Sequence, residues 1–202
     1  MASQERDIQT LEAKHLLQVY KRVPIVFTRG EGSYIYDIDG RKYLDFVSGL
    51  GVASLGHANP ELATALADQA RKLLHTSNLY FHPLQGQVGQ RLASLSGLQR
   101  AFFCNSGTEA VEGCLKFARR YWHTQGNTSR TRIVALERSF HGRTFGSLSA
   151  TWEPGYRKPF EPLLPEVSFV SPTEPQALER VVSSDVAAII VEPIQGEGGI
   201  WP

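Results

Sequence analysis

The chain has 202 residues, of which 42% are apolar and 10% aromatic. This apolar content is enough for a sizeable core, so the composition excludes a disordered or fibrous protein. Twenty-one Lys and Arg against 20 Asp and Glu leave a formal net charge of +1. No long-range field therefore favours nucleic acid or an acidic membrane surface, and we expect neither as a partner.

We also expect no membrane span, no secretory signal and no metal site. The longest apolar run near the C-terminal end, residues 186–191, has six residues, whereas a membrane helix needs about twenty. The N-terminal residues lack the apolar core of a signal peptide, which indicates a cytoplasmic location. Cys104 and Cys114 have no CxxC or Cys/His spacing, so we interpret both as small buried side chains.

The first hundred residues predict a helix, a small antiparallel sheet and two further helices. Residues 8–20 form a weak amphipathic pattern, and Asn59-Pro60-Glu61 supplies an N-cap, a proline and an acid for a helix that runs to about His75. A second helix includes Leu84 to Leu95 and stops at Gly97. Turn residues at 30–32 and 39–40 separate three short strands, which we place at residues 25–27, 34–36 and 43–46.

From residue 101 the pattern alternates between strand and helix, which is typical of an α/β protein with a mainly parallel sheet. The predicted elements are a strand at 101–104, a helix at 107–122, a strand at 133–136, a helix at 175–184 and a strand at 186–191. Eight of the 11 prolines lie beyond residue 150. We interpret the proline-rich connection between the second of these strands and the second helix as an ordered surface loop.

Polar residues between a predicted strand and a predicted helix form the first candidate site, Asn105-Ser106-Gly107-Thr108-Glu109-Ala110. A helix start offers free N–H groups and the positive end of the helix dipole, and Gly107 lets an anion approach the backbone. Ser106 and Thr108 add hydroxyl donors. The alternative is a capping box formed by Ser106 and Glu109, which binds nothing.

Two further loops follow predicted strands. In Ser139-Phe140-His141-Gly142-Arg143-Thr144, Phe140 could stack on a flat ring and Arg143 could hold a carboxylate; the alternative is a core aromatic beside a solvated arginine. Ligands of open α/β sheets collect at the carboxyl ends of strands, so this loop and the 105–108 loop could open into one crevice. Residues 191–199 bring Glu192, Glu197 and three glycines to another strand end, as a site loop or an ordinary turn. His57 we interpret as a local hydrogen-bonding residue.

Taken together, these segments resemble the class III, ornithine-type aminotransferases, which are pyridoxal-phosphate enzymes of fold type I. The resemblance covers about residues 20–202 and rests on six blocks in the family's order. They are Gly40-Arg41-Lys42-Tyr43-Leu44-Asp45-Phe46, Leu55-Gly56-His57 with Asn59-Pro60, His75-Thr76-Ser77-Asn78, residues 105–110, Phe140-His141-Gly142-Arg143-Thr144 and residues 191–199.

The resemblance implies an aspartate-aminotransferase-like large domain with a mainly parallel sheet, incomplete here and preceded by a small α+β segment. Residues 1–50 would belong to the small domain and residues 51–202 to the first part of the domain that binds pyridoxal phosphate. The family's Schiff-base lysine and the aspartate facing the ring nitrogen both come after the 191–199 loop. We therefore expect the chain to be the N-terminal half of a protein of roughly 400 residues, a length implied by the resemblance, and to be inactive alone.

Residue roles follow from the resemblance by position. Ser106, Gly107 and Thr108 match the cup for the cofactor phosphate, and Phe140 matches the aromatic that stacks on the pyridine ring. Arg143 matches the clamp on the substrate α-carboxylate. Glu197 matches the acid that helps the site accept two amino donors, and Glu192 belongs to the same loop. Tyr20 and Asn78 match positions at the substrate entrance.

The implied reaction moves the terminal amine of an amino acid to pyridoxal phosphate and then to 2-oxoglutarate, in a homodimer. Ornithine enzymes of the family tend to carry a tyrosine at the position of Leu50 and acylornithine enzymes an aliphatic residue. Leu50 therefore favours N-acetylornithine or a close acyl relative, which indicates arginine biosynthesis. The alternatives are another ω-aminotransferase, acting on ornithine, succinylornithine, 4-aminobutyrate or an acylated lysine, an aminomutase, and a non-catalytic module that keeps the cofactor cup or subunit interface.

Overall fold

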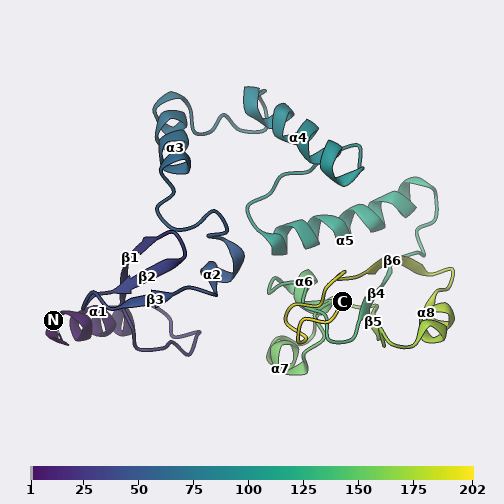
Figure 1. The fold of residues 1–202 in the computed structure, drawn as a ribbon. Helices are drawn as coiled ribbons and strands as arrows, with labels where there is room; N and C mark the ends of the chain where they lie inside the picture. The colour runs from purple at the N-terminus through teal and green to yellow at the C-terminus, as the bar shows by residue number, and fades with distance from the viewer. Residues whose placement is uncertain (1) are drawn as a thin grey trace. The chain divides into compact units, whose positions relative to one another are not determined.

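The structure is a computed structural model that describes residues 2–202. The chain divides into two compact units, Met1–His82 and Pro83–Pro202, and each is described here by itself (Figure 1). The domain boundary expected after residue 50 stays a prediction.

The first unit contains the predicted antiparallel meander. A helix, α1 (Ala2–His15), precedes strands β1 (Phe27–Glu31), β2 (Tyr34–Asp37) and β3 (Lys42–Leu44), which pair in the order β1-β2-β3. The helix ends five residues earlier than residue 20, the expected end. Beyond this end, the Gln18 amide donates to the carbonyls of Glu12 at 3.2 Å and Leu16 at 2.8 Å.

Asp37 fixes the turn between β2 and β3. Its buried carboxylate accepts the N–H groups of Asp39 (3.0 Å) and Arg41 (2.8 Å), the Arg41 Nε–H (2.7 Å) and the Tyr43 hydroxyl (2.8 Å). Burial alone would raise the pKa of Asp37, but the hydrogen bonds from Tyr43 and Arg41 outweigh it and hold the pKa below its usual value. The Asp39-Gly40 turn that the sequence predicts is therefore held by a charged group.

His57 is a local structural residue, as its sequence context predicted. Its Nε2 lies 2.7 Å from an Asp45 carboxylate oxygen, and the other Asp45 oxygen accepts the N–H groups of Val47 and Ser48. The His57 backbone also exchanges two hydrogen bonds with Gly32. These contacts tie the loop after β3 to the sheet.

Three helices follow: α2 (Ser48–Gly51) and α3 (Pro60–Lys72) in the first unit, and α4 (Pro83–Ser96) in the second. The predicted start of α3 is confirmed, because Asn59 accepts the Leu62 N–H at 3.0 Å. Gly97 follows α4 at a φ of 73°, a conformation that glycine adopts readily.

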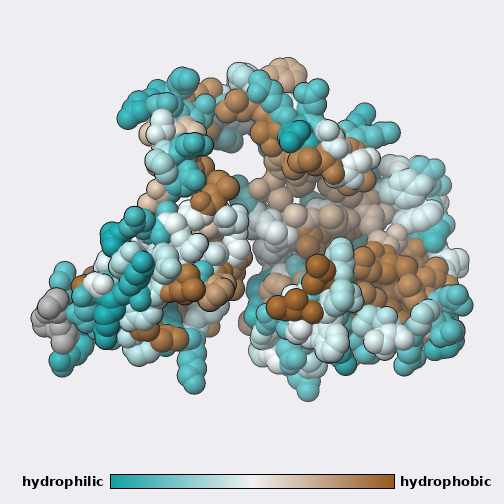
Figure 2. Space-filling view, viewed as in Figure 1, coloured by the Kyte–Doolittle hydropathy of each residue, from teal (hydrophilic) through white to brown (hydrophobic). Residues whose placement is uncertain are grey.

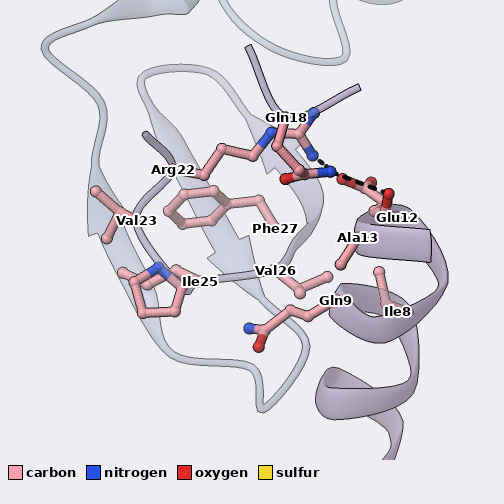
Figure 3. A pocket seen from close by; sticks show the side chains of 11 residues that line it. Ile8, Gln9, Glu12, Ala13, Gln18, Arg22, Val23, Ile25, Val26 and Phe27 are labelled. Carbon is pink, nitrogen blue, oxygen red and sulfur yellow. Dashed lines mark hydrogen bonds and ion pairs between the residues drawn. The ribbon is translucent and has the colours of Figure 1, made fainter. Parts of the chain in front are cut away.

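A hollow of about 390 Å³ lies between α1 and the segment that leads into β1 (Figure 3). The Glu12–Arg22 ion pair and the Gln18 amide stand beside it. Its lining is otherwise mainly apolar and consists of Ile8, Gln9, Ala13, Val23, Pro24, Ile25, Val26 and Phe27. Tyr20, the predicted entrance residue, is 75% exposed and is not part of this lining.

The second unit contains a parallel three-stranded sheet. Strand β4 (Arg132–Leu136) lies between β5 (Val167–Val170) and β6 (Val186–Ile190) and pairs parallel with both. The helices of this part are α5 (Gly107–Thr124), α6 (Phe145–Ser149), α7 (Pro154–Arg157), a 3₁₀ turn at Lys158–Phe160, and α8 (Pro175–Val181). The predicted mainly parallel α/β layering is confirmed.

The hydrophobic core of this unit is centred on strand β4. Ile133, Val134 and Ala135 are fully buried, and because side chains alternate along a strand, they cover both faces of the sheet. Val134 packs with Val170 and Val186. Ala177, Leu178 and Val181 of α8 pack against this cluster, and Figure 1 shows α8 beside the strands.

Two expectations for this unit are wrong. Residues 101–104 form no strand, and Phe102 is 62% exposed. A strand requires a hydrogen-bonding neighbour, and in the described sheet none of the three strands pairs with this segment. Cys104 and Cys114 are both exposed rather than buried.

The proline-rich connection also differs from the expected surface loop. It contains α7, the 3₁₀ turn and the strand β5. Strand β5 completes one side of the sheet, so part of the supposed loop belongs to the core.

The apolar stripe that predicts α4 lies at the surface of its unit. Figure 2 shows apolar side chains over this helix, and the exposed members are Leu84, Val88, Leu92 and Leu95. Among the described residues, no helix combines the length and the apolar character that a membrane crossing requires.

Glu112 of α5 caps the start of α6. Its Oε1 accepts the hydroxyl of Thr144 (2.5 Å) and the N–H groups of Gly146 (2.9 Å) and Ser147 (3.1 Å). Thr144, the N-cap residue of α6, makes no capping bond of its own. A carboxylate from another helix therefore satisfies these orphan donors.

Replacement of Glu112 by alanine is expected to lower the unfolding free energy of the full-length protein by about 1.5–3 kcal/mol, because three donors lose a charged acceptor. Glu112→Gln keeps an acceptor oxygen and is expected to cost less. Urea unfolding measures both, with Glu179→Ala on the exposed side of α8 as the control. Equal losses for Glu112→Ala and the control would contradict the capping role.

Arg132 ties the start of β4 to the turn before β6. Its Nε donates to Asp185 at 2.9 Å, and its Nη2 donates to Ser183 at 2.7 Å and to the Val181 carbonyl at 2.8 Å. The hydrogen bond from Arg132 is the main reason that the pKa of Asp185 falls from 3.8 to about 2.

Because the folded-state pKa of Asp185 is depressed, its stabilising contribution is complete above about pH 4 and is lost as the pH falls toward 2. Asp185→Asn is expected to lower stability at pH 7 and to flatten its decline between pH 4 and 2. Urea unfolding across this range tests it, with Asp68→Asn in the exposed Asp68–Arg71 pair as the control. An unchanged acid decline in Asp185→Asn would refute the assignment.

Candidate active site

Two loops meet at the carboxyl ends of β4 and β6. The strands are parallel, so the loop of residues 137–144 after β4 and the loop of residues 191–199 after β6 leave the sheet at the same edge. Glu192 joins them, because its carboxylate accepts the Phe140 N–H at 2.7 Å. One of the two acids predicted for the 191–199 loop is thus occupied in holding the other loop.

Gln195 and Gly198 add two further contacts between these loops. The buried Gln195 amide donates to the Glu137 carbonyl at 2.8 Å. A Cβ on Gly198 would stand 2.6 Å from the Arg138 carbonyl oxygen, so glycine permits a close approach of the two backbones. The 191–199 loop is therefore a packed part of this edge.

The predicted capping box is present at the start of α5. The Ser106 hydroxyl accepts the Glu109 N–H at 3.3 Å, and the Glu109 carboxylate accepts the Asn105 N–H at 2.7 Å. Hydrogen bonds from Asn105 are the main reason that the pKa of Glu109 lies below its usual value.

The capping box leaves two backbone donors of α5 available. The N–H groups of Gly107 and Thr108 have no acceptor within the helix, and no side chain in the described part of the chain accepts from them. Leaving aside its chain neighbours and the backbone of the helix itself, no heavy atom of the described residues lies within 4 Å of the position that a Cβ would take on Gly107. Capping and anion binding are therefore compatible at this helix start.

The Thr108 side chain faces the 137–144 loop. Its hydroxyl lies 2.9 Å from the Thr144 hydroxyl and 2.6 Å from that of Ser147. A Cβ at Gly142, whose φ is 131°, would overlap Thr108, so this position requires glycine. The 105–108 and 139–144 loops thus lie in contact.

His141 is buried beneath this edge. Its N–H donates to the Thr151 hydroxyl at 2.9 Å, and its Nε2 has no partner among the described residues. Burial lowers the pKa of His141 and the charge of Glu192 offsets this only in part. The ring is therefore neutral at pH 7.

Two predicted site residues line a hollow of about 560 Å³, and a third, Arg143, contacts the ring of Tyr156 in its lining. Phe140 and Glu197 line it together with Tyr156. The Arg143 guanidinium carbon lies 3.6 Å from the centre of the Tyr156 ring and 5.5 Å from that of Phe140. Volumes of this size are typical of small-molecule sites.

Tyr156 connects the members of this cluster. Its hydroxyl donates to Glu197 Oε1 at 2.8 Å, and its ring meets that of Phe140 edge-on with 6.5 Å between the centres. The hydrogen bond to Glu197 is the main reason that the pKa of Tyr156 lies above its usual value. Tyr156 is therefore a protonated donor at neutral pH.

The remaining predicted positions lie elsewhere. The hollow is not lined by Ser106, Gly107 or Thr108. Thr108 of α5 instead contacts Thr144, at the end of the 137–144 loop. Tyr20 and Asn78, like Leu50, are exposed residues of the first unit. Their roles stay predictions.

The sequence interpretation missed Tyr156 and Glu112. Tyr156 lies in the connection taken as a loop, where Pro154 and the preceding acid Glu153 indicate a helix start that would have placed it on an ordered element. Glu112 sits inside a predicted helix, and nothing in a local pattern distinguishes it from a solvated acid.

The second unit thus brings together backbone donors for an anion, an aromatic face and a guanidinium that could hold a carboxylate. No group of three His, Cys, Asp or Glu side chains suited to a metal ion occurs in the part of the chain that the structure describes. The donors present suit an organic anion with a flat ring.

Comparison with known proteins identifies the family. The profile of the family described as Aminotransferase class-III matches residues 17–202. An acetylornithine aminotransferase of Archaeoglobus fulgidus is 48% identical over 191 residues, which are 95% of this chain and 49% of that protein. The chain therefore spans about half the length of this relative.

Solved structures of aminotransferases have the same fold as this chain. An ornithine aminotransferase from Toxoplasma gondii superimposes with a TM-score of 0.91 and 30% identity, over 98% of this chain and 47% of the other. An amine transaminase from an uncultivated Pseudomonas species, solved with bound pyridoxal phosphate (PLP), gives a TM-score of 0.80 and 32% identity, over 88% of this chain and 46% of the other. The predicted fold type I is confirmed, and the chain belongs to the class-III aminotransferase family.

Proposed function

We propose that the protein carrying this chain is a pyridoxal-phosphate-dependent aminotransferase that moves the terminal amine of N-acetylornithine, or a close acyl relative, to 2-oxoglutarate in arginine biosynthesis. The main support for the proposal is that Phe140, Arg143 and Glu197 cluster at one edge of the sheet. The 48% identity to an acetylornithine aminotransferase supports the choice of amino donor.

The residues present fit pyridoxal phosphate. The free N–H groups of Gly107 and Thr108, with the Ser106 hydroxyl beside them, suit a phosphate dianion at the positive end of the 18-residue helix α5. The half-buried Phe140 ring faces the hollow and suits a pyridine ring. When bound, this cofactor supplies a carbonyl that exchanges with the substrate amine and a ring that withdraws electrons.

The chain's own residues orient and bind the substrate in this proposal. Arg143 presents a planar fork of donors to the substrate α-carboxylate. Glu197 takes part in no ion pair within the described part of the chain, and it lines the hollow, where its carboxylate accepts the Tyr156 hydroxyl. Phe140 and Tyr156 contribute aromatic surface to the lining of the hollow.

Leu50 supports an acylated donor. The resemblance places an aliphatic residue at this position in acylornithine enzymes, and an aliphatic side chain near the substrate would favour a neutral acyl group over the free ammonium of ornithine, because a charge beside apolar surface loses hydration. The proposal also retains a homodimer, as the resemblance implies, and a cytoplasmic location. The net charge of +1 supports neither nucleic acid nor membrane as a partner.

Rates on a panel of amino donors test the reaction in the full-length protein. We expect kcat/KM for N-acetylornithine to exceed that for ornithine by about tenfold or more, within the range that one unsuited contact produces. The panel also contains succinylornithine, 4-aminobutyrate and an acylated lysine. A preference for ornithine or 4-aminobutyrate would overturn the donor assignment, and no transfer to 2-oxoglutarate from any donor would overturn the reaction.

Arg143→Ala is expected to lower kcat/KM for N-acetylornithine about 10- to 150-fold, because a charged hydrogen bond is worth about 1.5–3 kcal/mol. Arg143→Lys retains the charge without the planar fork and is expected to lose less. The exposed Arg120→Ala of α5 is the matched control. An unchanged kcat/KM in Arg143→Ala would show that the clamp is wrongly assigned.

A further inference from the structure

Polar side chains interlock where the start of α5 meets the start of α6. The Thr108 hydroxyl of α5 lies 2.6 Å from the Ser147 hydroxyl and 2.9 Å from the Thr144 hydroxyl. The Thr144 N–H also donates to the Thr108 hydroxyl, at 3.3 Å. Glu112, further along α5, accepts the Thr144 hydroxyl at 2.5 Å. The hydroxyl of a residue in the predicted phosphate cup is thus part of a hydrogen-bond network.

The hydrogen bonds of Glu112 determine which way the Thr144 hydroxyl points. Glu112 Oε1 accepts the N–H groups of Gly146 at 2.9 Å and Ser147 at 3.1 Å. An oxygen that accepts two N–H groups carries no proton of its own, so the Thr144 hydroxyl is the donor to it. Because a hydroxyl has a single proton, Thr144 can only accept hydrogen bonds from the hydroxyls of Thr108 and Ser147.

The protons of Thr108 and Ser147 remain to be placed. Their oxygens lie 2.6 Å apart, a hydrogen-bond distance, so one hydroxyl donates to the other. If Ser147 is the donor, Thr108 keeps its own proton, which can turn from Thr144 to an anion at the start of α5. If Thr108 is the donor, its proton is used inside the network. A phosphate dianion only accepts hydrogen bonds, so its binding favours the first arrangement.

Close packing holds Ser147 against Thr108. Ser147 is fully buried. Gly142 has a φ of 131°, and a Cβ there would stand 2.6 Å from the Ser147 hydroxyl oxygen. A Cβ on Gly146 would overlap the Glu112 carboxylate. Both positions require glycine, which permits the close approach of α6 and its preceding loop to α5.

We infer that Ser147 is a positioning residue for the cofactor: its hydroxyl donates to Thr108 and so directs the Thr108 proton to the cofactor phosphate. The inference rests on the proposed function and deepens it, because it adds a side-chain donor to the N–H groups of Gly107 and Thr108. A hydroxyl that accepts one hydrogen bond donates a stronger one. Ser147 acts through Thr108, and its role is in the affinity for the cofactor.

The affinity of the full-length protein, freed of cofactor, for pyridoxamine phosphate tests the inference. This aminated form of the cofactor lacks the aldehyde that reacts with a lysine, so calorimetry measures reversible binding independently of turnover. Ser147→Ala removes the donor and is expected to raise the dissociation constant about two- to tenfold, the range for one lost hydrogen bond.

Ser149→Ala is the matched control for this variant. Ser149 is also buried in α6, but its hydroxyl donates to the Phe145 carbonyl and accepts the Leu164 N–H. Its replacement therefore removes a buried hydroxyl from the same helix without changing the contacts of Thr108. We expect Ser149→Ala to bind pyridoxamine phosphate as tightly as the parent protein.

Variants at Thr108 separate the hydrogen bond from packing. Thr108→Val removes the hydroxyl at nearly constant shape and is expected to weaken binding at least as much as Ser147→Ala. Thr108→Ser keeps the hydroxyl and is expected to bind nearly as tightly as the parent. In the Thr108→Val, Ser147→Ala double variant no hydroxyl remains to be directed, so Ser147→Ala is expected to add no further loss.

Each result decides between the possibilities. Unchanged affinity in Ser147→Ala, or a loss equal to that in Ser149→Ala, overturns the inference. Losses that add in the double variant also overturn it, because Ser147 then acts through packing. Unchanged affinity in Thr108→Val overturns it and leaves the backbone donors of the cup in place. A parent protein that does not bind pyridoxamine phosphate overturns the proposed function itself, which is a distinct outcome.

Discussion

The parallel pairing of β4 with β5 and β6 determines where the chemistry-bearing loops of the second unit lie. Ile133, Val134 and Ala135 are fully buried, so β4 is fixed in the centre of the sheet. Parallel neighbours end at the same edge, which brings the loops after β4 and β6 together although about fifty residues separate them. The hydrogen bonds of Glu192 and Gln195 that join these two loops follow from this shared edge.

The acids near the candidate site divide into those that accept backbone N–H groups and Glu197, which accepts a side-chain hydroxyl. Glu112 caps α6 and Glu192 accepts the Phe140 N–H. Both are occupied in fixing loops, as is Glu109 at the start of α5. Glu197 instead accepts a side-chain hydroxyl next to the hollow. Glu109, Glu112 and Glu192 therefore fix the backbone near the candidate site, whereas Glu197 contacts a side chain that lines the hollow.

Local patterns predicted the elements whose apolar runs are strong, namely α3, α5, β4 and β6. They failed where the outcome depends on distant residues. The apolar segment 101–104 has the composition of a strand but no pairing partner in the described sheet, whereas 167–170, between prolines, becomes one because β4 lies beside it. The candidate loops were predictable because glycines and polar residues follow apolar strands. Tyr156 and Glu112 were not, since their contacts reach across 41 and 32–35 residues.

A chain with a net charge of +1 exerts little long-range attraction on a dicarboxylate, so its affinity depends on charges placed at the site itself. A site with one cation and one anion close together has an inherent conflict, because the most favourable partner of each is the other. An amphipathic ring resolves it: its face attracts the guanidinium and its hydroxyl attracts the carboxylate. In the described part of the chain, Tyr156 therefore contacts a cation through the face of its ring and an anion through its hydroxyl, so both charges have a partner although they do not pair with each other.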